Sequence, residues 1–139
     1  MEKKINITYQ TTQFEKLNLD IQALINASEM AVLTSHAPYS NFHVGAALLL
    51  EDGKIIKGSN QENVSFPLGF CAERTALSAK VAIAPKEKIL AIAISALSGT
   101  GKILPPIPPC GICRQVLLEQ EQNQKAPIKV YLSGKSENT

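Results

Sequence analysis

The sequence predicts an α/β fold in which helices pack on the faces of a central β-sheet. Helical and strand-like patterns follow one another in the order helix, strand, strand, helix, strand, helix, strand. The apolar run Ile89–Leu97 is typical of a strand buried on both faces. The chain has 139 residues, of which 45% are hydrophobic, and this is enough for one domain with one buried core.

Residues 1–17 are expected to form an N-terminal extension, and residues 18–139 a single domain. In the extension, apolar residues alternate with polar ones at Ile5, Ile7 and Tyr9. Alternation with a period of two is typical of a half-buried strand. A short strand or an arm is therefore expected there.

The first half of the domain is expected to hold one helix and a β-hairpin. Apolar residues at helical spacing predict a helix over Leu19–Leu33, and Pro38 marks the turn that follows. Strands are expected at Val44–Leu50 and Ile55–Gly58. The Asp52-Gly53 pair between these strands is a strong signal for a hairpin turn.

The second half alternates between helices and strands. After an irregular polar stretch, Asn60–Phe70, a helix is expected over Cys71–Ala84. The central apolar strand follows, and then a rigid loop at Pro105–Pro109. A third helix is expected over Cys110–Gln120 and a last strand over Ile128–Leu132.

Charge and composition argue against several classes of protein. The formal net charge is +2, so no electrostatic attraction to nucleic acid or to an anionic membrane is expected. The longest apolar runs, VGAALLL and ILAIAISAL, are far shorter than the roughly 20 residues that span a bilayer. The odd number of cysteines does not suit a closed disulfide framework, and no signal peptide is apparent. A cytoplasmic location is therefore expected.

All three cysteines stand where predicted helices begin. Cys110 and Cys113 form the motif PCGIC, and residues at i and i+3 face one side of a helix. The partial positive charge of a helix N-terminus favours the thiolate form of such cysteines. Taken alone, this C-x-x-C motif fits a redox pair, a metal site or a structural pair equally well. Cys71 has the same setting on another helix, and its presence favours the metal site.

Together the three thiolates predict a catalytic zinc site. Two helix N-termini that point at each other would offer three sulfurs to one ion, and three protein ligands with one open position are typical of catalytic zinc. Glu73, in the first turn after Cys71, is placed to take a proton from a metal-activated water. Arg74 falls on the same side of the helix as Cys71, where its charge is expected to offset that of the thiolates.

These motifs resemble the signature of the zinc deaminases, H-x-E…P-C-x-x-C, in which cysteine can replace the histidine. The corresponding residues here are CAE and PCGIC. Three longer strings, PYSNFHVGAALL, NQENVSFPLGFCAERTAL and PPCGICRQVLLE, are similar to the small homotetrameric cytidine deaminases of pyrimidine salvage. The similarity covers roughly residues 19–134. This chain has a cysteine in place of the histidine and Arg74 directly after the glutamate, and both features resemble the branch of the family that acts on free nucleosides.

The resemblance implies a fold and a reaction. The implied fold is a three-layer α/β/α sandwich with a mixed central sheet. The implied reaction is the hydrolytic deamination of cytidine and 2′-deoxycytidine to uridine and 2′-deoxyuridine, with release of ammonia. One zinc ion per subunit, a homotetramer and a pyrimidine nucleoside as the small-molecule partner are implied as well.

By position, the resemblance also assigns a function to individual residues. Those that match zinc ligands are Cys71, Cys110 and Cys113, and Glu73 matches the proton shuttle. Those that match substrate contacts are Phe42 against the pyrimidine, the backbone N–H of Ala72 at the base carbonyl, and Asn60 with Glu62 at a ribose hydroxyl. Two simpler interpretations stay open: Phe42 is a core residue, and Asn60 only shapes a turn.

Three other functions also stay open at this point. Deaminases for modified cytosine nucleosides such as blasticidin S share the Cys-Ala-Glu and PCGxCRQ motifs, but apolar residues are typical where this chain has Arg74-Thr75. A zinc-stabilised nucleoside-binding module would not need Glu73. A thiol–disulfide redox protein would need Cys110 and Cys113 to oxidise reversibly. Finally, the resemblance implies a C-terminal aromatic residue that stacks over the base, and the last stretch, LSGKSENT, contains none.

Overall fold

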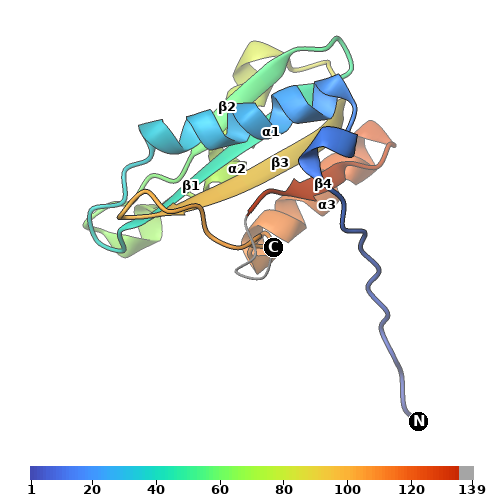
Figure 1. Ribbon diagram of the computed structural model, residues 1–139. Coiled ribbons are helices and arrows are strands. Elements are labelled where there is room, and N and C mark those ends of the chain that lie inside the picture. The colour runs from blue at the N-terminus through green and yellow to red at the C-terminus, as the bar shows by residue number, and fades with distance from the viewer. Residues whose placement is uncertain (135–139) are drawn as a thin grey trace.

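The computed structural model describes residues 1–134 and contains the expected series of helices and strands (Figure 1). The helices are α1 (Leu19–Ala31), α2 (Ala72–Ile83) and α3 (Gly111–Gln124). The strands are β1 (Phe42–Leu50), β2 (Ile55–Ser59), β3 (Ile89–Ser98) and β4 (Lys129–Leu132). Short 3-10 helices span Phe14–Lys16, Val32–Thr34 and Phe66–Leu68. None of the helices in this part of the chain is both long enough and apolar enough to span a membrane.

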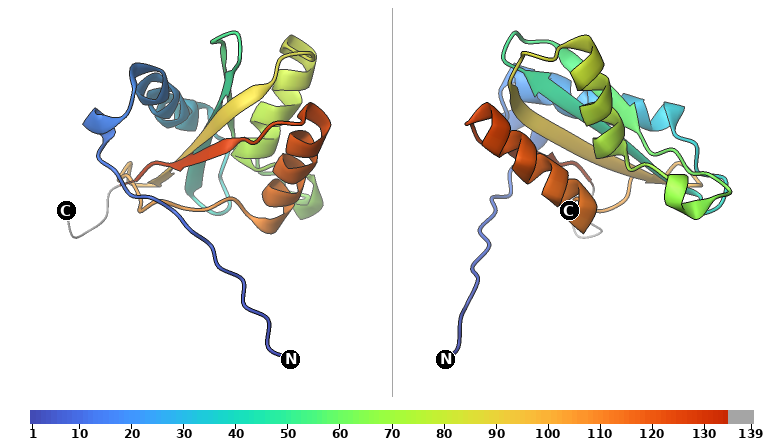
Figure 2. Two further views of the ribbon diagram at one scale, coloured as in Figure 1. Left: turned by 90° about the vertical axis from the view of Figure 1, so that its right-hand side faces the viewer. Right: turned by 180° about the vertical axis from the view of Figure 1, so that it is seen from behind.

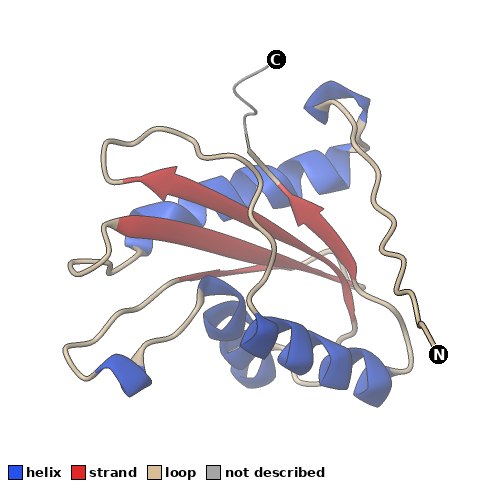
Figure 3. Ribbon diagram, turned by 90° about the horizontal axis from the view of Figure 1, so that it is seen from below, coloured by secondary structure: helices blue, strands red, loops and turns tan. Residues whose placement is uncertain are grey.

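The strands of the described residues form one mixed sheet in the order β2-β1-β3-β4. Strand β1 runs antiparallel to both β2 and β3, whereas β3 runs parallel to β4. A parallel pair requires a crossover connection, and α3 forms it between β3 and β4. The crossover brings the start of α3 to the same side of the sheet as α2 (Figure 3).

Helices cover both faces of the sheet, so the molecule has three layers (Figure 2). Because side chains alternate along a strand, β1 and β3 contribute to two separate cores. The core on the side of α2 and α3 includes Leu48, Leu50, Leu77, Ile92, Ile94 and Leu117. The core on the side of α1 includes Ile21, Leu24, Ile25, Ala47, Leu49 and Ala93. The expected three-layer α/β/α sandwich with a mixed sheet is therefore confirmed.

Two glycines allow helices to lie close against the sheet. A Cβ atom on Gly45 of β1 would lie 2.0 Å from the carbonyl oxygen of Ser28 in α1. A Cβ atom on Gly58 of β2 would lie 2.3 Å from the backbone nitrogen of Ala76 in α2. Because the clashing atoms belong to backbone, each glycine is needed for the close approach of its strand to a helix.

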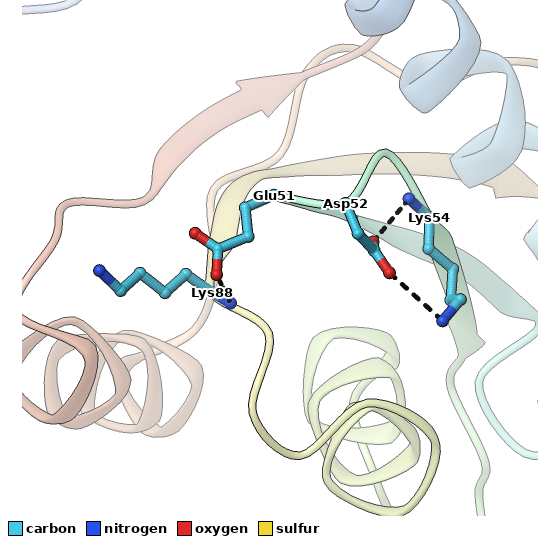
Figure 4. Close-up of polar contacts among 4 residues, drawn as sticks. All are labelled: Glu51, Asp52, Lys54 and Lys88. Atoms are coloured by element: carbon cyan, nitrogen blue, oxygen red, sulfur yellow. Dashed lines mark hydrogen bonds and ion pairs between the residues drawn. The ribbon is translucent and has the colours of Figure 1, made fainter.

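The hairpin between β1 and β2 closes in the predicted Asp-Gly turn, where Gly53 has a φ of +83°. Asp52 accepts the backbone N–H of Lys54 at 2.9 Å and forms an ion pair with its Nζ at 3.4 Å (Figure 4). The carboxylate of Glu51 accepts the backbone N–H of Lys88 at 3.4 Å. This last contact ties the turn to the start of β3 (Figure 4).

Helix α3 extends beyond the predicted end at Gln120 because a distant strand holds its last turn. The side-chain amide of Gln124 accepts the backbone N–H of Ile89 at 3.0 Å and donates to its carbonyl oxygen at 2.9 Å. The helix then ends at Lys125, whose φ of 54° is left-handed. This contact could not be predicted from a local sequence pattern, because Gln124 and Ile89 lie far apart in the chain.

The strand considered for the N-terminal segment does not form. Residues 1–13 contain no helix or strand, and the side chains of Ile5, Ile7 and Tyr9 are exposed. The segment runs away from the domain (Figure 1). An alternating pattern becomes a strand only where a neighbouring strand pairs with its backbone, and no described strand lies beside this one.

Candidate active site

The N-termini of α2 and α3 bring the three cysteines together. Cys71 is the N-cap residue of α2 and Cys110 that of α3, and both have an extended backbone conformation. Cys113 follows in the first turn of α3, and its side chain is completely buried. Two helix starts that are far apart in the sequence thus meet at one point on one face of the sheet.

The three sulfur atoms form a compact cluster, all within 4.8 Å of one another. The Sγ atom of Cys71 lies 3.8 Å from that of Cys110, which lies 3.5 Å from that of Cys113. No disulfide joins them, since all three cysteines are free. A tetrahedral zinc ion with Zn–S bonds of about 2.3 Å places its sulfurs about 3.8 Å apart. The sulfur cluster therefore fits zinc in both donor type and spacing.

Cys110 and Cys113 have different environments. The backbone N–H of Cys113 donates to the Sγ atom of Cys110 at 3.5 Å, and this contact lowers the pKa of the Cys110 thiol. Burial raises the pKa of the Cys113 thiol, and the nearby charge of Glu73 raises it further. A cation held by the sulfurs stabilises their thiolate forms directly, which offsets the effect of burial on Cys113.

The first turn of α2 contributes a carboxylate and a backbone donor. Glu73 is only 5% exposed and lies in the first turn of α2, directly after the N-cap Cys71 and Ala72. Its charge contributes to the raised pKa of Cys113. Ala72 is fully buried at the first position of the helix. The first N–H groups of a helix have no partner within it. The start of α2 therefore presents sulfur, carboxylate and N–H groups together.

Arg74 lies against the sulfur cluster, on the side of α2 that carries Cys71. Its Nη2 atom donates to the Sγ atom of Cys71 at 3.9 Å and to the carbonyl oxygen of Gly69 at 3.2 Å. The guanidinium also lies over the ring of Phe70, 4.6 Å from its centroid. Burial lowers the pKa of Arg74, but the hydrogen bond to Cys71 and the charges of the cysteines outweigh burial and raise the pKa overall. Arg74 is thus held as a cation next to the sulfurs.

Phe42 and Asn60 are joined by hydrogen bonds at the start of β1. The side-chain amide of Asn60 donates to the carbonyl oxygen of Phe42 and accepts the backbone N–H of Val44, both at 2.8 Å. The side chain of Phe42 is 38% exposed, so it is not the core residue that was considered as an alternative. Asn60 does shape the local backbone through these two hydrogen bonds. Its side-chain amide keeps a second N–H donor that can contact a ligand.

The carboxylate of Glu62 faces the turn that precedes β1. It accepts the backbone N–H groups of Tyr39 at 2.9 Å and of Ser40 at 3.3 Å, and it also accepts the hydroxyl of Ser40. These hydrogen bonds, that of the Ser40 hydroxyl first, hold the pKa of Glu62 below its usual range. Glu62 is therefore ionised at neutral pH and acts as an acceptor.

Gln61 connects the loop of Asn60 and Glu62 to the sulfur cluster. Its backbone N–H donates to the carbonyl oxygen of Phe70 at 2.9 Å, and its carbonyl oxygen accepts the N–H of Phe70 at 2.8 Å. Phe70 immediately precedes Cys71, so this bridge fixes the loop relative to the start of α2. The structure thus brings the expected substrate contacts to the same end of the molecule as the sulfur cluster.

Sequence reasoning missed Gln61 and Ser40. The hydroxyl of Ser40 contacts both Glu62 and the backbone N–H of Phe42, the latter at 3.1 Å. The string PYSNF signals a turn, but a turn signal does not say which distant side chain the turn meets. The last stretch, LSGKSENT, lacks the C-terminal aromatic residue that the resemblance implies, and its residues 135–139 lie outside the described part of the chain.

Comparisons with known proteins agree with this picture. Residues 20–127 match the sequence model of the cytidine and deoxycytidylate deaminase zinc-binding region. A cytidine deaminase of Halalkalibacterium halodurans is 44% identical over 116 residues, which cover 84% of this chain and 81% of that protein. A cytidine deaminase of Sporosarcina psychrophila is 37% identical over 121 residues, which cover 87% and 85% of the two chains.

Solved structures show the same relationship. The crystal structure of a cytidine deaminase from Burkholderia pseudomallei aligns with a TM-score of 0.69 and 42% identity, over 83% of this chain and 85% of that chain. The cytidine deaminase of Mycobacterium tuberculosis aligns with a TM-score of 0.65 and 32% identity, over 84% and 91%. The fold and the sulfur cluster define a zinc-binding α/β domain, and the chain belongs to the family of cytidine and deoxycytidylate deaminases. The resemblance inferred from the sequence is confirmed, as is the expected enzyme class, a hydrolase that acts on C–N bonds.

Proposed function

We propose that this protein catalyses the zinc-dependent hydrolytic deamination of cytidine and 2′-deoxycytidine to uridine and 2′-deoxyuridine, with release of ammonia. The observation that carries the proposal is the cluster of three sulfurs within 4.8 Å of one another, next to the buried carboxylate of Glu73. A structural zinc site usually has four protein ligands, whereas a catalytic site keeps one position open. One zinc ion per subunit would supply Lewis acidity that makes a water molecule easier to deprotonate.

In this proposal Glu73 carries out the proton transfers. Its carboxylate takes a proton from the attacking water, delivers it to N3 of the pyrimidine and later protonates the leaving amine. Because the side chain is only 5% exposed, bulk water competes little for these protons. The backbone N–H of Ala72 donates to the carbonyl oxygen of the base and holds C4 toward the sulfur cluster.

Arg74 acts on the metal ligands. Three thiolates and one Zn²⁺ carry a net charge of −1, which weakens the ion as a Lewis acid. The guanidinium donates to the Sγ atom of Cys71 at 3.9 Å and withdraws part of that charge. Arg74 thereby keeps the metal acidic enough to activate water at neutral pH.

The nucleoside is bound by three residues at the neighbouring strand ends. The exposed ring of Phe42 offers a flat apolar surface to the pyrimidine. Asn60 and the ionised Glu62 hydrogen-bond a ribose hydroxyl, and a site that reads a hydroxyl in this way discriminates strongly against analogues that lack it. We assign the enzyme to the cytoplasm and to the salvage of free pyrimidine nucleosides.

The protein is also proposed to be a homo-oligomer, and the resemblance to the family implies a tetramer. Large apolar side chains are exposed in the segment just before Cys71, at Val64, Phe66, Leu68 and Phe70. Large exposed apolar side chains that gather on one segment are typical of an interaction site, because their burial is favourable. Association through this segment would also shield the start of α2 from water.

The proposal is tested by following the ultraviolet absorbance of cytidine and of 2′-deoxycytidine with purified, zinc-loaded protein and with a Glu73→Ala variant. We expect turnover of both nucleosides by the wild type and a loss of at least about a hundredfold in the variant, which keeps its zinc. A zinc-loaded wild type that leaves both nucleosides unchanged would contradict the proposal. Turnover only of a modified cytosine nucleoside would favour the alternative deaminase instead.

A further inference from the structure

The turn before β1 contains a serine whose hydroxyl touches two of the proposed substrate contacts. We propose that Ser40 is a positioning residue that couples the pyrimidine contact of Phe42 to the ribose contact of Glu62, and so sets the selectivity of the site for nucleosides with ribose hydroxyls. This inference rests on the proposed function, since it assumes that Phe42 and Glu62 bind the nucleoside.

The direction of both hydrogen bonds of the Ser40 hydroxyl follows from its partners. The hydroxyl lies within hydrogen-bonding distance of Oε1 of Glu62, and its oxygen lies 3.1 Å from the backbone nitrogen of Phe42. An ionised carboxylate can only accept, and a backbone N–H can only donate. The hydroxyl must therefore donate to Glu62 and accept from Phe42, and only this orientation satisfies both partners at once.

This arrangement leaves Glu62 one defined position for a substrate. An ionised carboxylate has about four lone-pair directions. The Oε2 atom of Glu62 accepts the N–H groups of Tyr39 and Ser40, at 2.9 and 3.3 Å, and Oε1 accepts the Ser40 hydroxyl. The remaining direction on Oε1 is available to a ribose hydroxyl, and Ser40 determines where it points.

The turn that carries Ser40 is itself fixed to the sheet. Asn41 has a left-handed backbone with a φ of 55°, and its N–H donates to the carbonyl oxygen of Ala37 at 3.0 Å. The side chain of Asn41 lies over Gly99, where an added Cβ atom would come within 1.8 Å of Nδ2. The backbone N–H of Glu62 donates to the carbonyl oxygen of His36 at 2.8 Å. The backbone on either side of the contact is thus held by hydrogen bonds, and the hydroxyl links the two segments.

Removal of the Ser40 hydroxyl should affect selectivity more than folding. The side chain of Ser40 is exposed, so its loss leaves no cavity. The carboxylate of Glu62 would keep its two backbone donors on Oε2 but could rotate about them, and the N–H of Phe42 would lose its partner. Both changes loosen the site where the sugar and the base meet.

The test compares cytidine with 2′,3′-dideoxycytidine, which lacks both ribose hydroxyls, by measuring kcat/KM for each with zinc-loaded full-length protein. The variants are Ser40→Ala, Ser40→Thr, which keeps a hydroxyl, and Ser35→Ala as a matched control. The hydroxyl of Ser35 bonds the carbonyl oxygen of Val32 and Nδ1 of His43, both at 2.7 Å, and the structure gives it no contact with Glu62 or Phe42.

We expect the ratio of kcat/KM for cytidine to that for dideoxycytidine to fall about tenfold in Ser40→Ala. The ratio should stay near the wild-type value in Ser40→Thr and in Ser35→Ala. In a Glu62→Gln background, Ser40→Ala should lower the ratio no further, because the two residues act as one unit. Calorimetric binding of uridine and of 2′,3′-dideoxyuridine should show the same pattern without any turnover.

Two kinds of failure are distinguishable in this experiment. A wild type that neither converts cytidine nor binds uridine contradicts the proposed function. An active wild type whose ratio is unchanged by Ser40→Ala, or is lowered equally by Ser35→Ala, contradicts only the positioning by Ser40. Thermal melting of each variant shows whether a lowered ratio comes from a loss of folding, which would overturn the inference as well.

Discussion

The sulfur cluster and the proposed substrate contacts of this protein are built in different ways. The sulfur cluster stands on the first turns of α2 and α3, whose backbone is fixed by helical hydrogen bonds and by packing on the sheet. Phe42, Asn60 and Glu62 lie instead at strand ends and in a loop, where hydrogen bonds with the side chains of Asn60 and Glu62 hold the backbone. The geometry of the sulfur cluster therefore follows from the fold, whereas that of the proposed substrate site depends on polar contacts that one substitution can remove.

The largest effect is expected from Cys113→Ala. This variant removes the only cysteine of the cluster that is fully buried, so the site loses a ligand and the core gains a small cavity. We expect loss of zinc and turnover at background level, and both are checked by metal analysis and the absorbance assay. A Phe42→Ala variant, which changes the proposed substrate site instead of the sulfur cluster, should keep its zinc. A normal zinc content in Cys113→Ala would contradict the proposal that Cys113 is a zinc ligand.

Gly45 and Gly58, the two glycines that let helices lie close against the sheet, test whether the packing of α2 affects the sulfur cluster. Gly58→Ala and Gly45→Ala should each lower the free energy of unfolding by about 1–3 kcal/mol, because the added methyl group meets backbone. On Gly58 that group would also lie 2.7 Å from the carbonyl oxygen of Ala72, so the start of α2 must shift. Only Gly58→Ala is therefore expected to weaken zinc binding, as measured by chelator competition alongside denaturant unfolding. Equal zinc affinities in the two variants would show that α2 does not set the geometry of the site.

A smaller effect is expected from Arg74→Ala, which leaves the sulfurs in place but removes the neighbouring cation. We expect kcat to fall about tenfold with little change in KM, because the guanidinium is proposed to act on the metal ligands rather than on the substrate. Arg114→Ala is a suitable control, since the Nε atom of Arg114 donates to the carbonyl oxygen of Pro109 at 3.1 Å near the start of α3. A rise in KM alone for Arg74→Ala would contradict its proposed effect on the metal.

The smallest expected effect is a pH dependence of the free energy of unfolding that comes from Glu62, in the loop of the proposed substrate site. The pKa of Glu62 is lowered in the folded protein, mainly by the Ser40 hydroxyl, so the ionised carboxylate stabilises the fold above its unfolded pKa. That contribution is lost as the pH falls through the lowered, folded-state pKa. The difference in unfolding free energy between wild type and Glu62→Gln should therefore be greatest near neutral pH and should shrink in acid. A difference that is independent of pH in denaturant titrations would contradict this account.

The same contrast explains what the sequence could predict. The cysteines were predictable because their spacing and the helix starts are local features, and two helix N-termini on one face of a sheet bring them together. The contact between Ser40 and Glu62 and the bridge between Gln61 and Phe70 were not, because each joins loop residues that are distant in sequence. The choice between a strand and an arm near Ile5 was open for the same reason, since only pairing with a partner strand makes a strand.

The most direct test of the central claim is to measure the zinc content and the thiol reactivity of the purified protein together. We predict one zinc ion per chain, as seen by native mass spectrometry, and three thiols that alkylate slowly until a strong chelator is added. Protection should include Cys110, although its side chain is exposed, because metal ligation and not burial protects it. A zinc-supplemented protein whose three thiols react at once, or one that carries a disulfide between Cys110 and Cys113, would contradict a metal centre at the two helix ends.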